Sequence, residues 1–119
     1  MSITYKRGEI GERPWGHWEV LDLGDNFIVK RIVVRPGAAL SLQLHHFRAE
    51  DWTIASGEAA FTLGEEVFNM RRGQTLYIPR GTQHRIENVG KDDLIVIEVQ
   101  MGENLDESDI IRLDDRYAR

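Results

Sequence analysis

Two stretches of this sequence, residues 37–57 and 73–88, carry the side-chain types that bind divalent metals. An imidazole, a carboxylate and an amide oxygen suit Zn, Mn, Fe, Ni or Co, and coordination geometry rather than affinity usually selects among these metals. The alternative is a set of unrelated polar residues on separate strands. The candidate ligands, arranged around one open coordination position, are Gln43, His45, Glu50 and His84.

The spacing of these residues places a requirement on the chain between them. Residues 40–47 are predicted to form a strand, so alternation places His45 and Phe47 on one face. Glu50 has the opposite parity. For Glu50 to join His45 on one metal, we expect a bend or bulge near residues 46–49.

The other segments that must position this site are short and rich in strand-forming residues. The sequence has no long helical period, internal repeat, low-complexity segment or linker. Short strands with Gly and Pro turns at fairly even spacing predict an all-β sandwich or barrel. Gly64-Glu65 between two strands is typical of a type II′ hairpin. The predicted strands cover residues 17–21, 27–34, 40–47, 59–63, 66–70, 75–78, 84–87, 94–100 and 110–113, with a short helical turn at 105–109.

Length and composition restrict the class of protein. The 119 residues predict one domain over 1–119, with residues 1–13 as an arm or edge strand and 114–119 as a polar tail. The net charge of −5 argues against affinity for nucleic acid or anionic membranes, but it does not exclude a small anionic substrate. The acidic run over residues 103–115 is expected to be solvated surface.

The sequence lacks cysteine and any long apolar run, and these absences exclude several kinds of site and location. Without Cys there is no disulfide framework, thiolate nucleophile or Cys-ligated metal. No apolar run matches a signal peptide or the length of a membrane span. We therefore expect a soluble, cytoplasmic protein.

The two opening stretches resemble the two motifs of the cupin superfamily. The first motif is Gly, five residues, His-x-His, three or four residues, Glu, six residues and Gly, and here only the first His departs, being Gln43. The second is Gly, five residues, Pro-x-Gly, two residues, His, three residues and Asn, which residues 73–88 match at every spacing. The resemblance implies a small double-stranded β-helix, or jelly-roll barrel, with the four candidate ligands on one metal.

A narrower resemblance, to the type II mannose-6-phosphate isomerases, covers nearly the whole chain. It rests on the segments RPWG, VKRIVVRPGAALSLQ, RAEDW, YIPRGTQHRIEN and DDRYAR. Many such proteins carry this cupin after a mannose-1-phosphate guanylyltransferase half, which these residues do not match, so GDP-mannose synthesis is not expected of them. Phosphomannose isomerases use Gln-x-His, which suits Gln43. Phe47 and Asp51 depart from the family, which usually has His at both positions.

The narrower resemblance implies a metal-dependent isomerase that interconverts mannose 6-phosphate and fructose 6-phosphate. It suggests zinc as the metal. An aldose–ketose isomerase moves a proton between neighbouring carbons through an enediol(ate), and a metal would polarise the sugar oxygen. A base must also reach the C1–C2 region. The candidate catalytic residues are Lys30 and Arg48, with His46 and Glu98 as alternative bases.

The candidate substrate-binding residues are Arg116, Phe47 and Glu98. The substrate's phosphate needs a cationic partner, and Arg116 matches the family's terminal motif. The structural alternatives are a mobile tail for Arg116 and a solvent-facing side chain for Arg48.

Two other functions remain open from the sequence. A non-catalytic metal- and sugar-binding or regulatory cupin is consistent with Phe47 and Asp51. A small cupin dioxygenase would need iron and usually three His ligands, against which Gln43 argues. Small cupins usually pair through an N-terminal strand, so the resemblance also implies a homodimer, which would cover a sheet edge.

Overall fold

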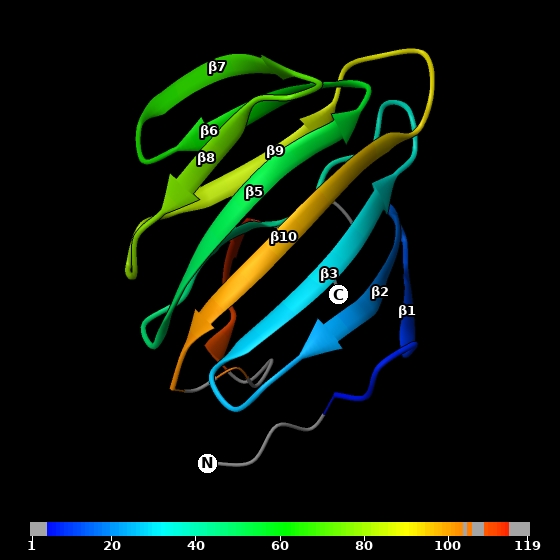
Figure 1. Ribbon diagram of the computed structural model, residues 1–119. Helices are drawn as coiled ribbons and strands as arrows, with labels where there is room; N and C mark the ends of the chain where they lie inside the picture. The colour runs from blue at the N-terminus through cyan, green and yellow to red at the C-terminus, as the bar shows by residue number, and fades with distance from the viewer. Residues whose placement is uncertain (1–4, 104, 106–108, 115–119) are drawn as a thin grey trace.

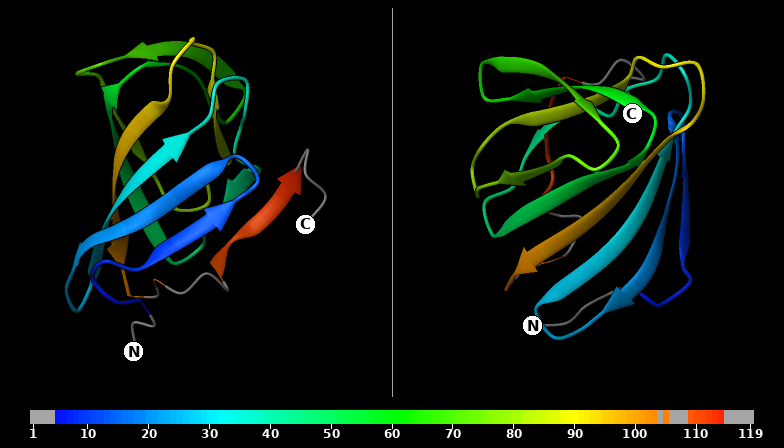
Figure 2. Two further views of the ribbon diagram at one scale, coloured as in Figure 1. Left: turned by 90° about the vertical axis from the view of Figure 1, so that its right-hand side faces the viewer. Right: turned by 45° about the horizontal axis from the view of Figure 1, so that its top comes forward.

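The computed structural model describes residues 5–103, 105 and 109–114. These residues confirm the all-β class, because they form two antiparallel sheets that face each other across a common interior (Figure 1, Figure 2). The strands are β1 (Ile10–Arg13), β2 (Gly16–Leu23), β3 (Phe27–Val34), β4 (Leu42–Leu44), β5 (Arg48–Ser56), β6 (Glu58–Leu63), β7 (Glu66–Arg71), β8 (Thr75–Ile78), β9 (His84–Asn88), β10 (Leu94–Gly102) and β11 (Ile111–Asp114).

The order of strands in each sheet mixes early and late parts of the chain. One sheet runs β1-β2-β3-β10-β5-β8 and the other β11-β4-β9-β6-β7. In Figure 1 the long strands β2, β3, β10 and β5 lie side by side as one curved layer. This arrangement is the double-stranded β-helix of the cupins, and it brings the two metal-motif stretches to the same interior.

The interior is packed where the two inner faces meet. Side chains alternate along β3, so Ile28, Ile32 and Val34 are buried while their neighbours are only half-buried. Phe61 and Ile86 complete this core from the opposite sheet. On β10 the inward face is Leu94, Val96, Glu98 and Gln100, which the sequence alone did not decide.

The strand predicted over residues 40–47 is wrong at both ends. Only β4 (Leu42–Leu44) forms there, and β5 begins after a bend at His46 and Phe47. The predicted bend between His45 and Glu50 is therefore confirmed. The helical turn predicted at 105–109 falls largely on residues 106–108, which lie outside the described residues.

The segment before β2 is an edge strand, one of the two expected alternatives. β1 pairs only with β2, through a two-residue connection, Pro14-Trp15, between Arg13 and Gly16. Gly16 has φ of 151°, and a Cβ there would stand 1.9 Å from the Val33 carbonyl oxygen. Glycine is required because the connection packs directly on β3.

Within the part of the chain described above, no helix has the length and apolar character that crossing a membrane requires.

Candidate metal centre

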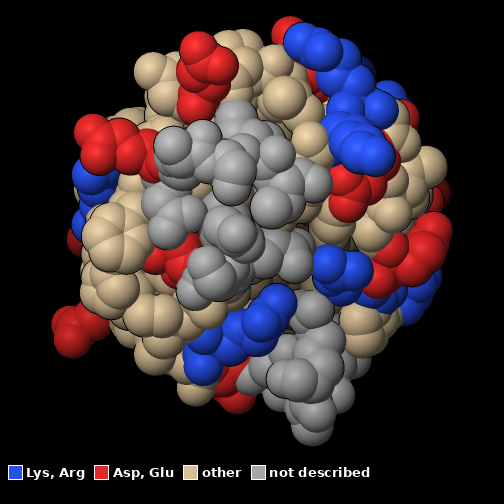
Figure 3. Space-filling model, turned by 90° about the horizontal axis from the view of Figure 1, so that it is seen from below, with Lys and Arg blue, Asp and Glu red and all other residues tan. Residues whose placement is uncertain are grey.

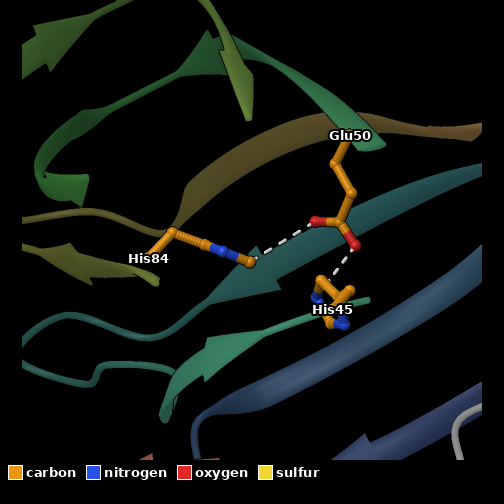
Figure 4. A group of neighbouring side chains, drawn as sticks. All are labelled: His45, Glu50 and His84. Atoms are coloured by element: carbon orange, nitrogen blue, oxygen red, sulfur yellow. Dashed lines mark ion pairs between the residues drawn. The ribbon is translucent and has the colours of Figure 1, made fainter. Parts of the chain in front are cut away.

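Three of the four predicted ligands converge in the interior. His45 follows β4, Glu50 lies on β5 and His84 begins β9. One ligand atom from each lies within 4.8 Å of the others. The His45 Nε2 to Glu50 Oε2 distance is 3.1 Å, and the His84 Nε2 to Glu50 Oε1 distance is 3.6 Å. Figure 4 shows each oxygen of Glu50 directed to a different imidazole.

The bend that brings Glu50 to His45 is held by a side chain far away in the sequence. Both carboxylate oxygens of Asp109 accept a hydrogen bond, from the backbone N–H groups of His46 and Phe47, at 3.0 Å each. Asp109 is buried, so the expectation that the acidic run over 103–115 is solvated surface is wrong at this position. A carboxylate satisfying two consecutive N–H groups compensates for the pairing that the chain loses where it leaves the sheet.

A backbone hydrogen bond orients the His84 imidazole. The Thr82 carbonyl can only accept a hydrogen bond, so His84 Nδ1, 3.0 Å away, donates, and Nε2 faces Glu50. Burial, reinforced by Arg48, lowers the pKa of His45 to about 4 against the opposing effect of Glu50. His45 is therefore neutral at neutral pH, which is the form that binds a metal.

Glu50 supplies the negative charge of the cluster. Burial opposes ionisation of this carboxyl, but Arg48 and the two imidazoles outweigh it and hold the pKa of Glu50 well below its usual range. Arg48 Nε donates to Oε2 at 2.9 Å, and Trp52 Nε1 donates to Oε1 at 2.8 Å. Two imidazoles and an ionised carboxylate make a donor set that fits a divalent metal. Sequence reasoning assigned no role to Trp52.

Arg48 is part of this cluster and not of the surface. Its side chain is only 3% exposed, and Nη2 lies 3.4 Å from His45 Nε2. Burial opposes its charge, but Glu50 and Glu98 together raise the pKa of Arg48. Among the described residues, its buried Nη1 has no hydrogen-bond partner. The burial of Arg48 shows that the solvent-facing alternative is wrong.

A cavity that opens to solvent adjoins the cluster. Arg48 and Trp52 line it and also hydrogen-bond Glu50, so they connect the cavity to the three ligands. Lys30 and Glu98 line it from paired positions on β3 and β10. Gln43, paired with His84 across β4 and β9, lines it from the opposite sheet and donates to Ser41 Oγ at 2.7 Å.

Lys30 and Glu98 occupy contrasting surroundings within this cavity. The Lys30 Nζ lies 4.2 Å and 4.4 Å from the ring centroids of Tyr5 and Trp18. Burial, reinforced by Glu50, raises the pKa of Glu98 to about 8, although Lys30 opposes the shift. Gln100 Nε2 donates to Glu98 Oε1 at 2.9 Å, while Gln100 Oε1 is buried without a partner. The interruption of β3 by a lysine is therefore explained by a polar cavity beside it.

Of the predicted substrate-binding residues that the structure describes, Glu98 lines the cavity and Phe47 does not. Phe47 was expected to share a face with His45, but it lies in the bend, is 53% exposed and does not line the cavity. That expectation is wrong because the strand on which alternation was counted ends before Phe47. Arg116 lies outside the described residues.

The two departures from the family pattern, Phe47 and Asp51, both lie away from the cavity. Asp51 is on β5 but points to the side opposite Glu50, where its Oδ1 accepts a hydrogen bond from Thr75 Oγ1 at 2.9 Å. Neither residue is among those that line the cavity.

Solved structures share this fold at low sequence identity. A structure concerned with the Mn(II) centres of Bacillus subtilis oxalate decarboxylase has a TM-score of 0.77 at 23% identity, covering 88% of this chain and 30% of that one. The cupin domain of Schizosaccharomyces pombe Cnp3 has a TM-score of 0.70 at 18% identity, covering 72% of this chain and 64% of that one. At this identity the likeness supports the cupin fold alone.

Sequence relatives are much closer but longer. The xanthan biosynthesis protein XanB of Xanthomonas campestris pv. campestris is 53% identical over 107 residues, which are 90% of this chain and 23% of that protein. The mannose-1-phosphate guanylyltransferase ManC of Salmonella typhimurium is 46% identical over 90% of this chain and 22% of its own length. The chain thus spans less than a quarter of these relatives. The family model described as "Mannose-6-phosphate isomerase C-terminal" matches residues 4–115, and the chain belongs to that family.

Proposed function

We propose that this chain is a metal-dependent isomerase that interconverts mannose 6-phosphate and fructose 6-phosphate. The observation that carries the proposal is the position of His45, Glu50 and His84 beside a cavity lined by Lys30 and Arg48. A metal-ligating cluster next to proton-carrying and cationic groups is what an enediol(ate) reaction requires. Membership of the family supports the same reaction.

The metal would be held by His45, Glu50 and His84, with the amide oxygen of Gln43 as the fourth ligand. We propose zinc, which accepts nitrogen and oxygen ligands in this combination. When bound, it would supply Lewis-acid polarisation of the sugar oxygens at C1 and C2.

The protein's own groups would carry the remaining chemistry. Lys30 Nζ is the proposed proton-transfer group, because the side chain is buried and lines the cavity beside the cluster. Arg48 would stabilise negative charge developing on the sugar through its unpartnered Nη1. Glu98 would bind a sugar hydroxyl beside Gln100. The apolar lining from Trp52 and Ile32 would limit the entry of water.

A coupled assay of the metal-reconstituted protein with mannose 6-phosphate tests the proposal. We expect turnover that disappears on chelation and returns when zinc is restored. His84→Ala should remove both turnover and stoichiometric metal, whereas His46→Ala should retain them. His46 is a matched control because it is an exposed neighbour of the site whose backbone N–H, not its ring, contacts Asp109.

Absence of turnover with Zn, Mn, Co, Ni and Fe, in a protein that still binds metal, would contradict the isomerase proposal. Retained metal together with binding of mannose 6-phosphate would then indicate the non-catalytic sugar-binding cupin. Lys30→Met separates the proton-transfer role from substrate binding, because it should lower kcat far more than it raises KM.

We also propose that the protein forms a homodimer through β1. This strand ends the six-stranded sheet, pairs with β2 on one side and carries Ile10, which is 55% exposed. An unpaired edge with an exposed apolar side chain favours association with another strand. Light scattering should give twice the chain mass, and Ile10→Lys should reduce it to the monomer. A monomeric wild-type protein at assay concentration would refute the dimer.

A further inference from the structure

The cavity has the opposite charge from the protein as a whole. The chain carries a net charge of −5, and acidic and basic side chains are interspersed on the surface seen in Figure 3. Four cationic side chains nevertheless line the cavity, against one carboxylate, that of Glu98. The four are Arg13, Lys30, Arg48 and Arg112. Such a concentration of positive charge in an acidic protein favours an anionic ligand.

Two of these cations have no place in the proposed proton transfer. Arg13 is the last residue of β1, which is separated from β10 and its Glu98 by β2 and β3. Arg112 comes from β11 in the opposite sheet, where it pairs with Gln43. Both line the same cavity, Arg13 from an edge strand of the six-stranded sheet and Arg112 from an edge strand of the five-stranded sheet.

Trp15 adds a buried donor to the wall of this cavity. It is 4% exposed, and among the residues that the structure describes its indole Nε1 has no hydrogen-bond partner. Buried indole N–H groups normally find an acceptor, and leaving one unsatisfied is costly. The close packing of Gly16 against Val33 fixes the connection that holds Trp15 next to Arg13. The Arg13 guanidinium is itself stacked 5.3 Å from the Trp18 ring centroid.

We propose that Arg13, Arg112 and the indole N–H of Trp15 bind the phosphate group of the substrate. Guanidinium groups match phosphate oxygens geometrically, and a neutral N–H supplies a further donor at fixed position. The site would orient the sugar so that its C1–C2 end faces the three metal ligands. The inference rests on the proposed function for the identity of the sugar, but binding of phosphate itself is independent of turnover.

Binding measurements on charge-neutralised variants test this site. Arg13→Gln and Arg112→Gln should each raise the Kd and KM for mannose 6-phosphate roughly tenfold or more, as loss of a charge-assisted hydrogen bond predicts, with a smaller decrease in kcat. Titrations would follow tryptophan fluorescence with mannose 6-phosphate, inorganic phosphate and unphosphorylated mannose. The variants should weaken the two phosphate ligands and leave mannose unaffected.

Changes in ionic strength and further substitutions test the proposed phosphate site more closely. Affinity for inorganic phosphate should fall with ionic strength in the wild type, and less so in either variant. Arg13→Lys should retain part of the affinity, and Trp15→Phe should lose some affinity while keeping an aromatic ring. Arg72→Gln is the matched control, because Arg72 is an exposed arginine between β7 and β8 and its loss changes net charge equally.

The outcomes separate this site from the isomerase proposal. Phosphate binding that both variants weaken, in a protein without turnover, would uphold the site and refute the isomerase. Turnover with a KM that changes no more in Arg13→Gln and Arg112→Gln than in Arg72→Gln would overturn the site alone. Failure of the wild type to bind either phosphate ligand would also overturn it. If Arg13→Gln does not fold, Arg112→Gln decides, because Arg112 is exposed.

Discussion

The inward face of β10 changes character halfway along the strand. Leu94 and Val96 pack into the apolar core, whereas Glu98 and Gln100, next on the same face, border the cavity. All four side chains are at most 4% exposed. Burial is therefore the same at the two ends of the strand, and only the chemistry of the surroundings differs.

This difference separates the part of the barrel that stabilises from the part that binds. At the apolar end, burial of Leu94, Val96 and Phe61 contributes the hydrophobic free energy of folding. At the polar end, charged and amide groups are removed from water, and several of their atoms find no partner in the protein. Desolvation without compensation opposes folding, so we interpret the polar end as a site completed by ligands.

The largest expected effect comes from neutralising the carboxylate of the cluster. Glu50→Gln should abolish metal binding and lower turnover by about a thousandfold or more, a loss typical of removing groups that stabilise transition-state charge. It should also reduce the free energy of unfolding of the metal-free protein by about 3–5 kcal/mol, because Arg48 is left buried without its counter-charge. Metal analysis, the coupled assay and urea unfolding measure the three quantities.

Glu65→Gln is the control for that substitution, since Glu65 is exposed in the β6–β7 turn. Retention of stoichiometric metal by Glu50→Gln would show that the polar end is not organised around this carboxylate.

The next largest effect is expected in the apolar core of the barrel. Phe61→Ala should lower the free energy of unfolding by about 3–5 kcal/mol, because Phe61 is fully buried and stacks edge-on against Trp52. Turnover per folded molecule should remain. Val67→Ala, at a position 66% exposed on β7, should change the urea midpoint little. A loss of specific activity in folded Phe61→Ala protein would mean that the two ends are not separable.

A smaller effect is expected at Trp52, which packs in the apolar core and donates a hydrogen bond to Glu50. Trp52→Phe keeps an aromatic ring against Phe61 but removes the N–H that donates to Glu50 Oε1 at 2.8 Å. Loss of a hydrogen bond that orients a metal ligand should weaken metal affinity by about 10–100-fold. Competition with a chelator measures the affinity. Unchanged metal affinity would show that Trp52 contributes to the apolar core and not to the metal centre.

The smallest effect is expected at the surface, where polar groups remain hydrated. The side-chain hydrogen bond from Arg7, at 2.8 Å, holds the pKa of Asp22 below its ordinary value. Because the folded pKa is lowered, this pair stabilises the protein above the unfolded pKa of about 3.8, and the contribution is lost as pH falls through the folded pKa. Asp22→Asn should therefore lower the urea midpoint slightly at neutral pH and not at low pH. A large change at neutral pH would contradict the expectation that an exposed, hydrated ion pair contributes little to stability.

Local sequence information was sufficient for most of the strands and for three of the ligands. Alternation and turn residues predicted the β2, β3 and β10 regions, and the Leu63–Glu66 pairing confirms the two-residue Gly64-Glu65 turn. The two motif spacings identified His45, Glu50 and His84. Phe47 was misplaced because parity counting assumes an unbroken strand, and the bend that interrupts it depends on Asp109, 62 positions away.

The sequence by itself determined the residue types of the site, the turns and the alternating strands, because these depend on neighbours within a few positions. Only the tertiary structure decided which face of β10 is inward, that Arg48 is buried against Glu50, and that Arg13 and Arg112 reach one cavity. The physical reason is that these contacts join strands distant in the chain. Their burial and charge are set by the pairing of the sheets, which no local pattern encodes.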